Sequence, residues 1–179
     1  MKKLIIGIAS ASCLLMACNN KSSTTATGTD STTSNSNKIK QIALNSDLAF
    51  NNKDAEAVYK DCSSDFVDYG TAGESKPMKN IDSMKTNLKQ LFVAFPDFKV
   101  ENLHAIAQGD TVMVLGDWSG TFKSEYMKIK PTGKSFKLTD VDVYTFNKDG
   151  KINSHKSIQS ETKILYQLGI PMPPPKKNK

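Results

Sequence analysis

Asp142 is the residue best placed to carry chemistry in this sequence of 179 residues. It lies in a stretch where polar and apolar side chains alternate, which predicts a β-strand in which one face carries Asp140, Asp142, Tyr144 and Phe146. Apolar surroundings disfavour a charged carboxylate, so its pKa rises and it can exchange protons with a weakly acidic C–H group. The alternative is a strand acid that pairs with a neighbouring lysine or amide.

Trp118 is a second candidate for the wall of a site. The alternation places it on one strand face with Val112, Val114 and Phe122, so it either lines a pocket or packs in the core. The two histidines, His104 and His155, lie far apart in the sequence, so we expect no metal site. For each of them a structural or surface role is the alternative to acid–base work.

The first 17 residues are typical of an export signal: two lysines, an apolar run and a small residue. Leu15-Met16-Ala17-Cys18 is typical of a bacterial lipoprotein signal, which predicts acylation of Cys18 after cleavage. The apolar run is shorter than the roughly 20 residues that a retained membrane span needs. Residues 18–37 are rich in Ser, Thr and Asn and predict a flexible tether. We therefore expect an exported protein, anchored to a membrane and facing the periplasm.

Cys62 and the basic residues count against two other functional classes, thiol catalysis and specific nucleic-acid binding. Cys62 has Asp61 and Asp65 nearby, which raise the pKa of a thiol and favour a buried apolar role over nucleophilic catalysis. All 24 basic residues are lysines, which counts against specific binding of nucleic acids, where arginine is the favoured reader. The Pro- and Lys-rich residues 172–179 predict an extended, solvated tail.

Residues 38–171 predict one domain of the α+β class. We expect helices over about 38–51, 55–60 and 81–95, a short strand at 66–70, and long strands at 98–107, 111–122, 135–146 and 151–159. A closing helix before Gly169 completes the pattern. Helices first and antiparallel strands afterwards favour a bent sheet that closes over the helices and leaves a pocket at its open end.

Several segments carry a resemblance to a known family: Phe95-Pro96-Asp97-Phe98, Val112 to Phe122, Pro131-Thr132-Gly133-Lys134, Asp142 to Phe146, Asp149-Gly150-Lys151-Ile152 and Gln167-Leu168-Gly169. Together they resemble the SnoaL-like polyketide cyclases and ester cyclases. That family belongs to the nuclear transport factor 2-like superfamily. The resemblance implies a cone-shaped, cystatin-like domain with N-terminal helices on a strongly curved mixed or antiparallel sheet.

The resemblance also assigns roles to residues. Asp142 falls on the aspartate that acts as general acid and base in the cyclases, and His155 falls on a histidine of a Glu-His-Trp segment. Asp68-Tyr69 stands where the family often has Asp-His, which makes Tyr69 either a hydroxyl donor to a substrate oxygen or a cap on the core. Phe122 replaces the histidine of a Gly-Thr-His segment, so one imidazole of the cyclase pocket is absent.

Two functions follow as hypotheses. In the first, Asp142 relays a proton beside a carbonyl group of a small apolar molecule, as in cyclisation or double-bond isomerisation, with no cofactor. In the second, the domain binds such a molecule without catalysis, because one scaffold hosts both enzymes and binders. A homodimer formed through the open face of the sheet, with Trp118 or Tyr126 at the seam, is compatible with either.

Overall fold

A computed structural model of the protein describes residues 29–71 and 76–171. The helices are α1 (Thr29–Leu48), the 3-10 helix η1 (Ala49–Asn52), α2 (Ala55–Tyr59), α3 (Ile81–Ala94) and α4 (Glu161–Leu168). The strands are β1 (Cys62–Thr71), β2 (Lys99–Gln108), β3 (Thr111–Thr121), β4 (Ser135–Phe146) and β5 (Ile152–Ser157). The predicted signal peptide, Cys18 and the tail at 172–179 lie outside the described residues.

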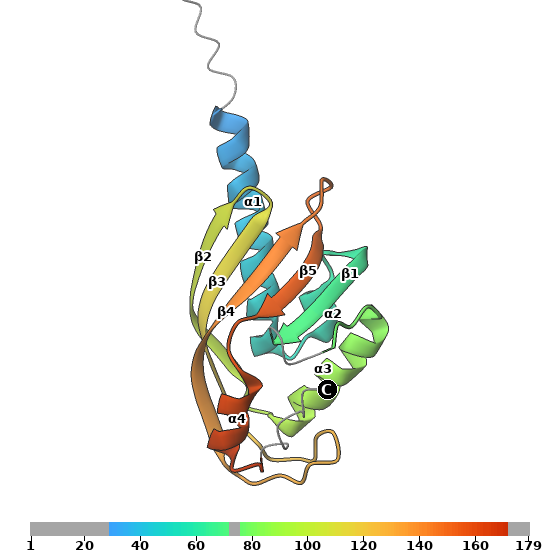
Figure 1. Cartoon of the computed structure of the whole chain (residues 1–179), viewed down its shortest axis with the longest axis vertical. Helices are drawn as coiled ribbons and strands as arrows, with labels where there is room; N and C mark the ends of the chain where they lie inside the picture. Colours follow the sequence, from blue (N-terminus) through green and yellow to red (C-terminus); the bar gives the residue numbers. More distant parts are fainter. Residues whose placement is uncertain (1–28, 72–75, 172–179) are drawn as a thin grey trace, which may run out of the picture.

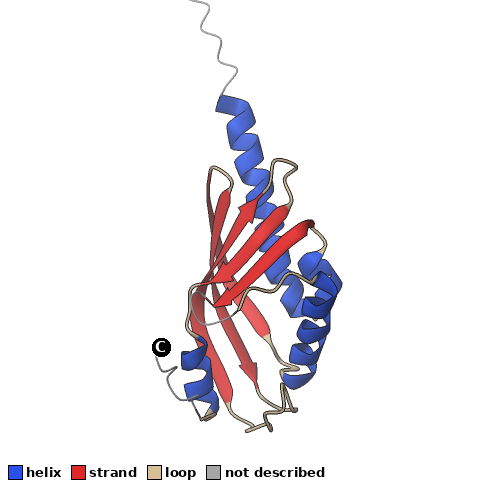
Figure 2. Ribbon diagram, turned by 45° about the vertical axis from the view of Figure 1, so that its right-hand side comes forward, coloured by secondary structure: helices blue, strands red, loops and turns tan. Residues whose placement is uncertain are grey.

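The five strands form one curved sheet in the order β1-β5-β4-β3-β2 (Figure 1). Strands β1 and β5 pair in parallel, and the other neighbours pair antiparallel. A register shift between Glu101 and His104, with Asn102 at φ 55°, adds a bulge that bends β2 against β3. The predicted α+β class with a curved mixed sheet is confirmed, and Figure 2 shows α1, α2 and α3 gathered on one side of the sheet.

The inner face of the sheet forms the core together with the helices. Alternation along β3 and β4 turns Val112, Val114, Tyr144 and Phe146 inward, where they pack against Ile39 and Ala43 of α1. A second group, including Phe122, Phe136 and Leu138, packs around α4 and the end of α3. Leu168 joins this second group at the last turn of α4. The two groups occupy opposite ends of the long strands and leave space between the sheet and the helices.

The largest differences from the predicted element boundaries are at the starts of α1 and β1. Helix α1 begins at Thr29 rather than at about Lys38, so residues 29–37 of the expected tether are helical. The packed turns around Ile39 supply the nucleus, and extending an existing helix costs little even through Ser, Thr and Asn. Strand β1 begins at Cys62 rather than at Phe66, because its pairing with β5 begins there. Among the described residues, no helix combines the length and apolar character required to cross a membrane.

Candidate active site

Three neighbouring strands bring together the acidic and imidazole side chains that the sequence singles out. In the parallel pair, Asp68 of β1 lies opposite His155 of β5. In the adjacent antiparallel pair, His155 lies opposite Tyr144 of β4, and Asp142 is two residues earlier on the same face. The register of two strand pairs therefore places Asp68, His155 and Asp142 in one row across the inner face.

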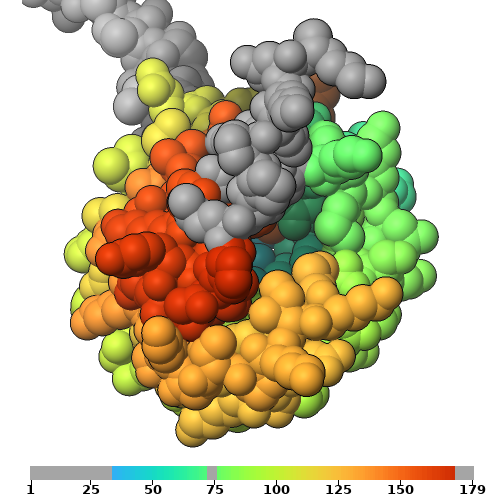
Figure 3. Space-filling view, turned by 60° about the horizontal axis from the view of Figure 1, so that its bottom comes forward, coloured from blue at the N-terminus to red at the C-terminus, as the bar shows by residue number. Residues whose placement is uncertain are grey.

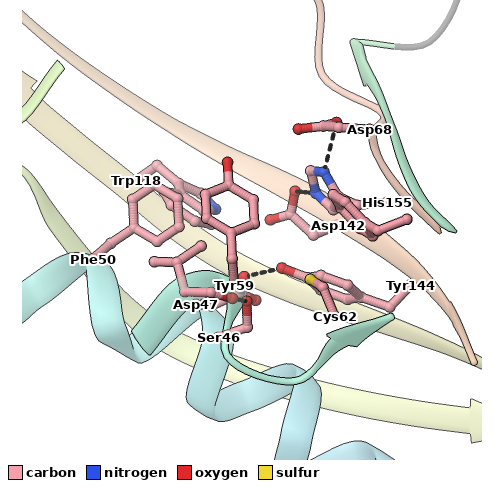
Figure 4. A pocket seen from close by; sticks show the side chains of 12 residues that line it. Ser46, Asp47, Phe50, Tyr59, Cys62, Asp68, Trp118, Asp142, Tyr144 and His155 are labelled. Atoms are coloured by element: carbon pink, nitrogen blue, oxygen red, sulfur yellow. Dashed lines mark hydrogen bonds and ion pairs between the residues drawn. The ribbon is translucent and has the colours of Figure 1, made fainter. Parts of the chain in front are cut away.

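His155 hydrogen-bonds to a carboxylate with each of its ring nitrogens (Figure 4). Its Nε2 lies 2.9 Å from Oδ1 of Asp142, and its Nδ1 lies 3.1 Å from Oδ1 of Asp68. Asp142 is 5% exposed. The side chains of His155 and Asp68 are 20% and 21% exposed. An imidazole that contacts two carboxylates is held in one orientation and is stabilised in its protonated form.

The charges of this row follow from burial and from the hydrogen bonds. Burial raises the pKa of Asp142, and the hydrogen bond and charge of His155 only partly offset this. Burial lowers the pKa of His155, but the hydrogen bonds that its ring donates to Asp142 and Asp68 outweigh burial and raise that pKa well above its ordinary value. For Asp68, burial is opposed by its bond to His155, and its pKa is lowered. Asp142 is thus the acid that is easiest to protonate in the row.

Asp47 of α1 is a buried acid that sequence reasoning missed. It is 0% exposed, and its Oδ1 accepts a hydrogen bond from the hydroxyl of Tyr144. Burial and the charge of Asp142 raise the pKa of Asp47 well above its ordinary value. Its burial could have been predicted from the sequence, because Asp47 follows Ile39 and Ala43 at helical spacing and so lies in the apolar stripe of α1.

Two adjoining chambers lie beneath the inner face of the sheet. The smaller has a volume of about 80 Å³ and is lined by Ser46, Asp47, Phe50, Val58, Tyr59, Cys62, Phe66, Asp68, Trp118, Asp142, Tyr144 and His155. The larger, of about 490 Å³, is lined mainly by apolar side chains of α3, β3, β4 and α4 and by residues 126–129. Figure 3 looks at the end of the molecule where a hollow lies between α3, α4 and the segment after β3. Phe50, Trp118 and Asp142 line both chambers.

The structure places most of the predicted site residues in these chambers. Trp118 lines both, Tyr144 and Asp68 line the smaller, and Phe122 lines the larger. Trp118 also packs edge-on against Phe50, at 5.1 Å between ring centroids. It therefore both lines a pocket and packs against a neighbouring aromatic ring, the two roles expected for it.

Tyr69 is placed elsewhere, and its predicted role as a pocket hydroxyl donor is wrong for this arrangement. It is 45% exposed and lines neither chamber. Successive strand residues point to opposite faces, so the inward direction of Asp68 turns Tyr69 outward.

The remaining candidates have structural roles. Asp140 accepts hydrogen bonds from the hydroxyl of Ser157 and the backbone N–H of Gln159, which explains why Asp142 rather than Asp140 is free for chemistry. Burial, and then Asp61 and Asp68, raises the pKa of Cys62 to about 12, so its thiol stays protonated. His104 is exposed on β2. Within residues 29–71 and 76–171, no cluster of three or more His, Cys, Asp or Glu side chains is arranged to hold a metal ion.

Comparisons with known proteins identify the family and the fold. A family model described as SnoaL-like polyketide cyclase matches residues 40–168. AclR from Streptomyces galilaeus, a candidate hydroxylase, is 27% identical with a TM-score of 0.64, over 79% of this chain and 91% of its own. IdmH from Streptomyces antibioticus, a candidate polyketide cyclase, is 24% identical with a TM-score of 0.59, over 74% of this chain and 99% of its own.

A SnoaL-like protein from Jannaschia sp. CCS1, a candidate polyketide cyclase, shares the fold at 15% identity, with a TM-score of 0.66 over 76% of this chain and 95% of its own. None of the curated proteins that were compared matches the sequence.

Proposed function

Because the chain belongs to the SnoaL-like polyketide cyclase family, we propose that it is a cofactor-independent cyclase or isomerase in which Asp142 moves a proton on a small, largely apolar molecule. Proteins of this family bind small apolar molecules as substrates. One observation carries the proposal: Asp142 lines both chambers, and its buried Oδ2 has no hydrogen-bond partner among the described residues. This oxygen is free to accept a proton from a molecule in the larger chamber.

The proposed reaction begins with Asp142 as a carboxylate. Its Oδ2 takes a proton from a carbon beside a carbonyl group, and the electron pair of that C–H bond moves into an enolate. In an isomerisation, Asp142 returns the proton to another carbon of the enolate. In a cyclisation, the enolate carbon bonds to a second carbonyl carbon of the same molecule, and Asp142 gives its proton to the new alkoxide. Neither course consumes an oxidant or reductant.

His155 and Asp68 set the proton affinity of Asp142 in this proposal. The protonated imidazole donates to Oδ1 of Asp142, which favours the carboxylate form of Asp142 and leaves Oδ2 for the substrate. Asp68 fixes the other ring nitrogen and stabilises the positive charge. His155 and Asp68 are positioning residues, because their hydrogen bonds are directed at one another and at Asp142.

The test follows hydrogen exchange at the acidic carbon of 2-tetralone, a bicyclic ketone, in D₂O. The protein should accelerate exchange, and Asp142→Asn should lower that acceleration by roughly 10²- to 10⁴-fold, since an amide accepts no proton. Asp149→Asn, the same change in an exposed turn, serves as the control. Equal exchange rates for the Asp142→Asn variant and the unmodified protein would rule out Asp142 as the base.

The alternative function is binding without catalysis, which the almost wholly apolar lining of the larger chamber favours. The same experiment separates the two. A protein that binds 2-tetralone but leaves its exchange rate unchanged is a binder of this kind.

We further propose that the protein is an exported lipoprotein held on a membrane through acylated Cys18 and facing the periplasm. The sequence Leu15-Met16-Ala17-Cys18 supports this. We also propose a homodimer through the outer face of the sheet. Trp118 and Tyr126, the residues expected at its contact, line the larger chamber instead. The exposed side chains of Ile106, Met113 and Leu115 support it, because Ile106 pairs with Met113 across the strands and Leu115 is two residues further along β3.

A further inference from the structure

Within the described part of the chain, three buried polar atoms on the side chains that line the smaller chamber have no hydrogen-bond partner: Oδ2 of Asp47, Nε1 of Trp118 and Oδ2 of Asp142. A buried polar group without a partner is costly, and such groups are rare in folded proteins. These side chains come from α1, β3 and β4, so three separate elements contribute an unsatisfied atom to one place. Figure 4 shows the three side chains around the chamber.

The three atoms differ in the kind of partner that they need. The indole Nε1 of Trp118 is a donor only. Asp47 already accepts the hydroxyl of Tyr144 on Oδ1, and its burial beside the charge of Asp142 favours the protonated form, so Oδ2–H is a second donor. Oδ2 of Asp142 is an acceptor when this residue is ionised. Two donors and one acceptor therefore surround the chamber.

The volume of the chamber limits what it can hold. About 80 Å³ is too little for a ring system but is enough for one polar group or a few water molecules, each of which takes roughly 30 Å³ in the liquid. A carbonyl oxygen has two lone pairs and no hydrogen, which matches the two donors. The adjoining larger chamber has room for the apolar remainder of such a molecule.

We infer that the smaller chamber is a subsite for one carbonyl or enolate oxygen of the ligand, with Asp47 and Trp118 as its hydrogen-bond donors. This inference rests on the proposed function, in which Asp142 takes the proton from the adjacent carbon. As the proton leaves, negative charge moves onto the oxygen, and fixed donors in a chamber shielded from water stabilise that charge. Asp47 keeps its proton throughout, so the carboxyl acts as a donor and not as a second base.

The experiment compares binding of 2-tetralone with binding of tetralin, which has the same ring skeleton without the carbonyl oxygen. Equilibrium dialysis of the full chain should show about tenfold tighter binding of 2-tetralone. Asp47→Leu and Trp118→Phe each remove a donor while keeping an apolar wall, and each should reduce that preference at least severalfold. Asp47→Asn keeps an N–H donor and should retain most of it.

The outcomes distinguish this inference from the proposed function. Equal binding of 2-tetralone and tetralin by the unmodified protein, or an unchanged preference in both Asp47→Leu and Trp118→Phe, would overturn the subsite alone. Hydrogen exchange that depends on Asp142 would then still support the proposed function. Failure of both compounds to bind would overturn the subsite together with the proposed function. Trp118→Phe lies outside α1, so it provides an answer even if Asp47→Leu does not fold.

Discussion

Among the individual side chains, His155 determines the charge of the site. Two carboxylates hold its ring, and its pKa is raised well above the ordinary value. NMR titration should therefore show the His155 ring still protonated at and above pH 6.5, the pKa of an unperturbed imidazole. Asp68→Asn should lower the pKa of His155, because it removes one of the two charges. A His155 ring that loses its proton below pH 6.5 in the unmodified protein would contradict this arrangement.

The same groups determine how stability depends on pH. The contribution of His155 is complete below about pH 6.5 and is lost as the pH rises through its raised folded-state pKa. Asp47 and Asp142 act in the same direction, since their raised pKa values make the folded state bind protons more tightly. The pKa of Asp68 is lowered, so its contribution is present above 3.8 and is lost as the pH falls through the folded value.

Urea unfolding across this range should consequently show a free energy of unfolding that declines as the pH rises above about 3.8, where Asp47 and Asp142 lose their protons in the unfolded chain. It should decline further above about 6.5, where His155 does the same. A steady rise from neutral to alkaline pH would contradict the assigned charges.

The sequence singles out Asp142 from alternation and family resemblance, and His155 and Asp68 from resemblance alone. It does not identify Asp47, because an acid in a predicted helix is ordinarily solvated, and its contact with Tyr144 joins residues 97 apart in the chain. It also assigns Tyr69 to the pocket, because the direction of a strand face depends on pairing that the sequence does not contain.

At the level of elements, α2 depends on its N-terminal cap. The side chain of Asp54 accepts hydrogen bonds from the backbone N–H groups of Glu56 and Ala57, and the helix supplies Val58 and Tyr59 to the smaller chamber. Asp54→Ala should lower the free energy of unfolding by about 1 kcal/mol, because two donors lose their partner. Urea unfolding measures this, with Lys60→Ala as the control at an exposed position. A loss no larger than that of the control would show that the cap contributes nothing.

The long elements are predicted more accurately than the short or polar ones. Strands β3 and β4 and helix α3 have clear apolar periodicity, and their observed bounds lie within one residue of those predicted. The start of β1 is not predicted because Ser63 and Asp65 interrupt the alternation of polar and apolar residues. In the structure, Ser63 belongs to the strand and donates a hydrogen bond to the backbone oxygen of Ile152. The first turns of α1 are hidden because Ser, Thr and Asn are weak helix formers.

For the molecule as a whole, the exposed apolar side chains on the outer sheet face predict self-association. Met113→Lys would place a charge at the centre of the proposed dimer contact and should convert a dimer to a monomer. Val93→Lys, at an exposed position on α3, is the matched control. Analytical ultracentrifugation measures the change, and a monomer in the unmodified protein would rule out the dimer.

Anchoring is a second prediction for the whole molecule. Cys18→Ser removes the thiol that would carry the acyl chains, so incorporation of labelled fatty acid should be lost and the protein should leave the membrane fraction. Cys62→Ser, which changes the partly buried cysteine of β1, should retain both label and membrane association. Equal labelling of the Cys18→Ser variant and the unmodified protein would refute acylation at Cys18.

The position of helix α1 determines which end of the molecule would face a membrane. Its 20 residues correspond to about 30 Å, and its first turns project from the end of the molecule opposite to α4 (Figure 1). The larger chamber lies at the α4 end. A protein tied to lipid beyond the start of α1 would then hold its entrance away from the bilayer, toward the surrounding water. A ligand would then reach the larger chamber by diffusion through water and not directly from the lipid. This favours ligands that are measurably soluble in water over those that remain in membranes.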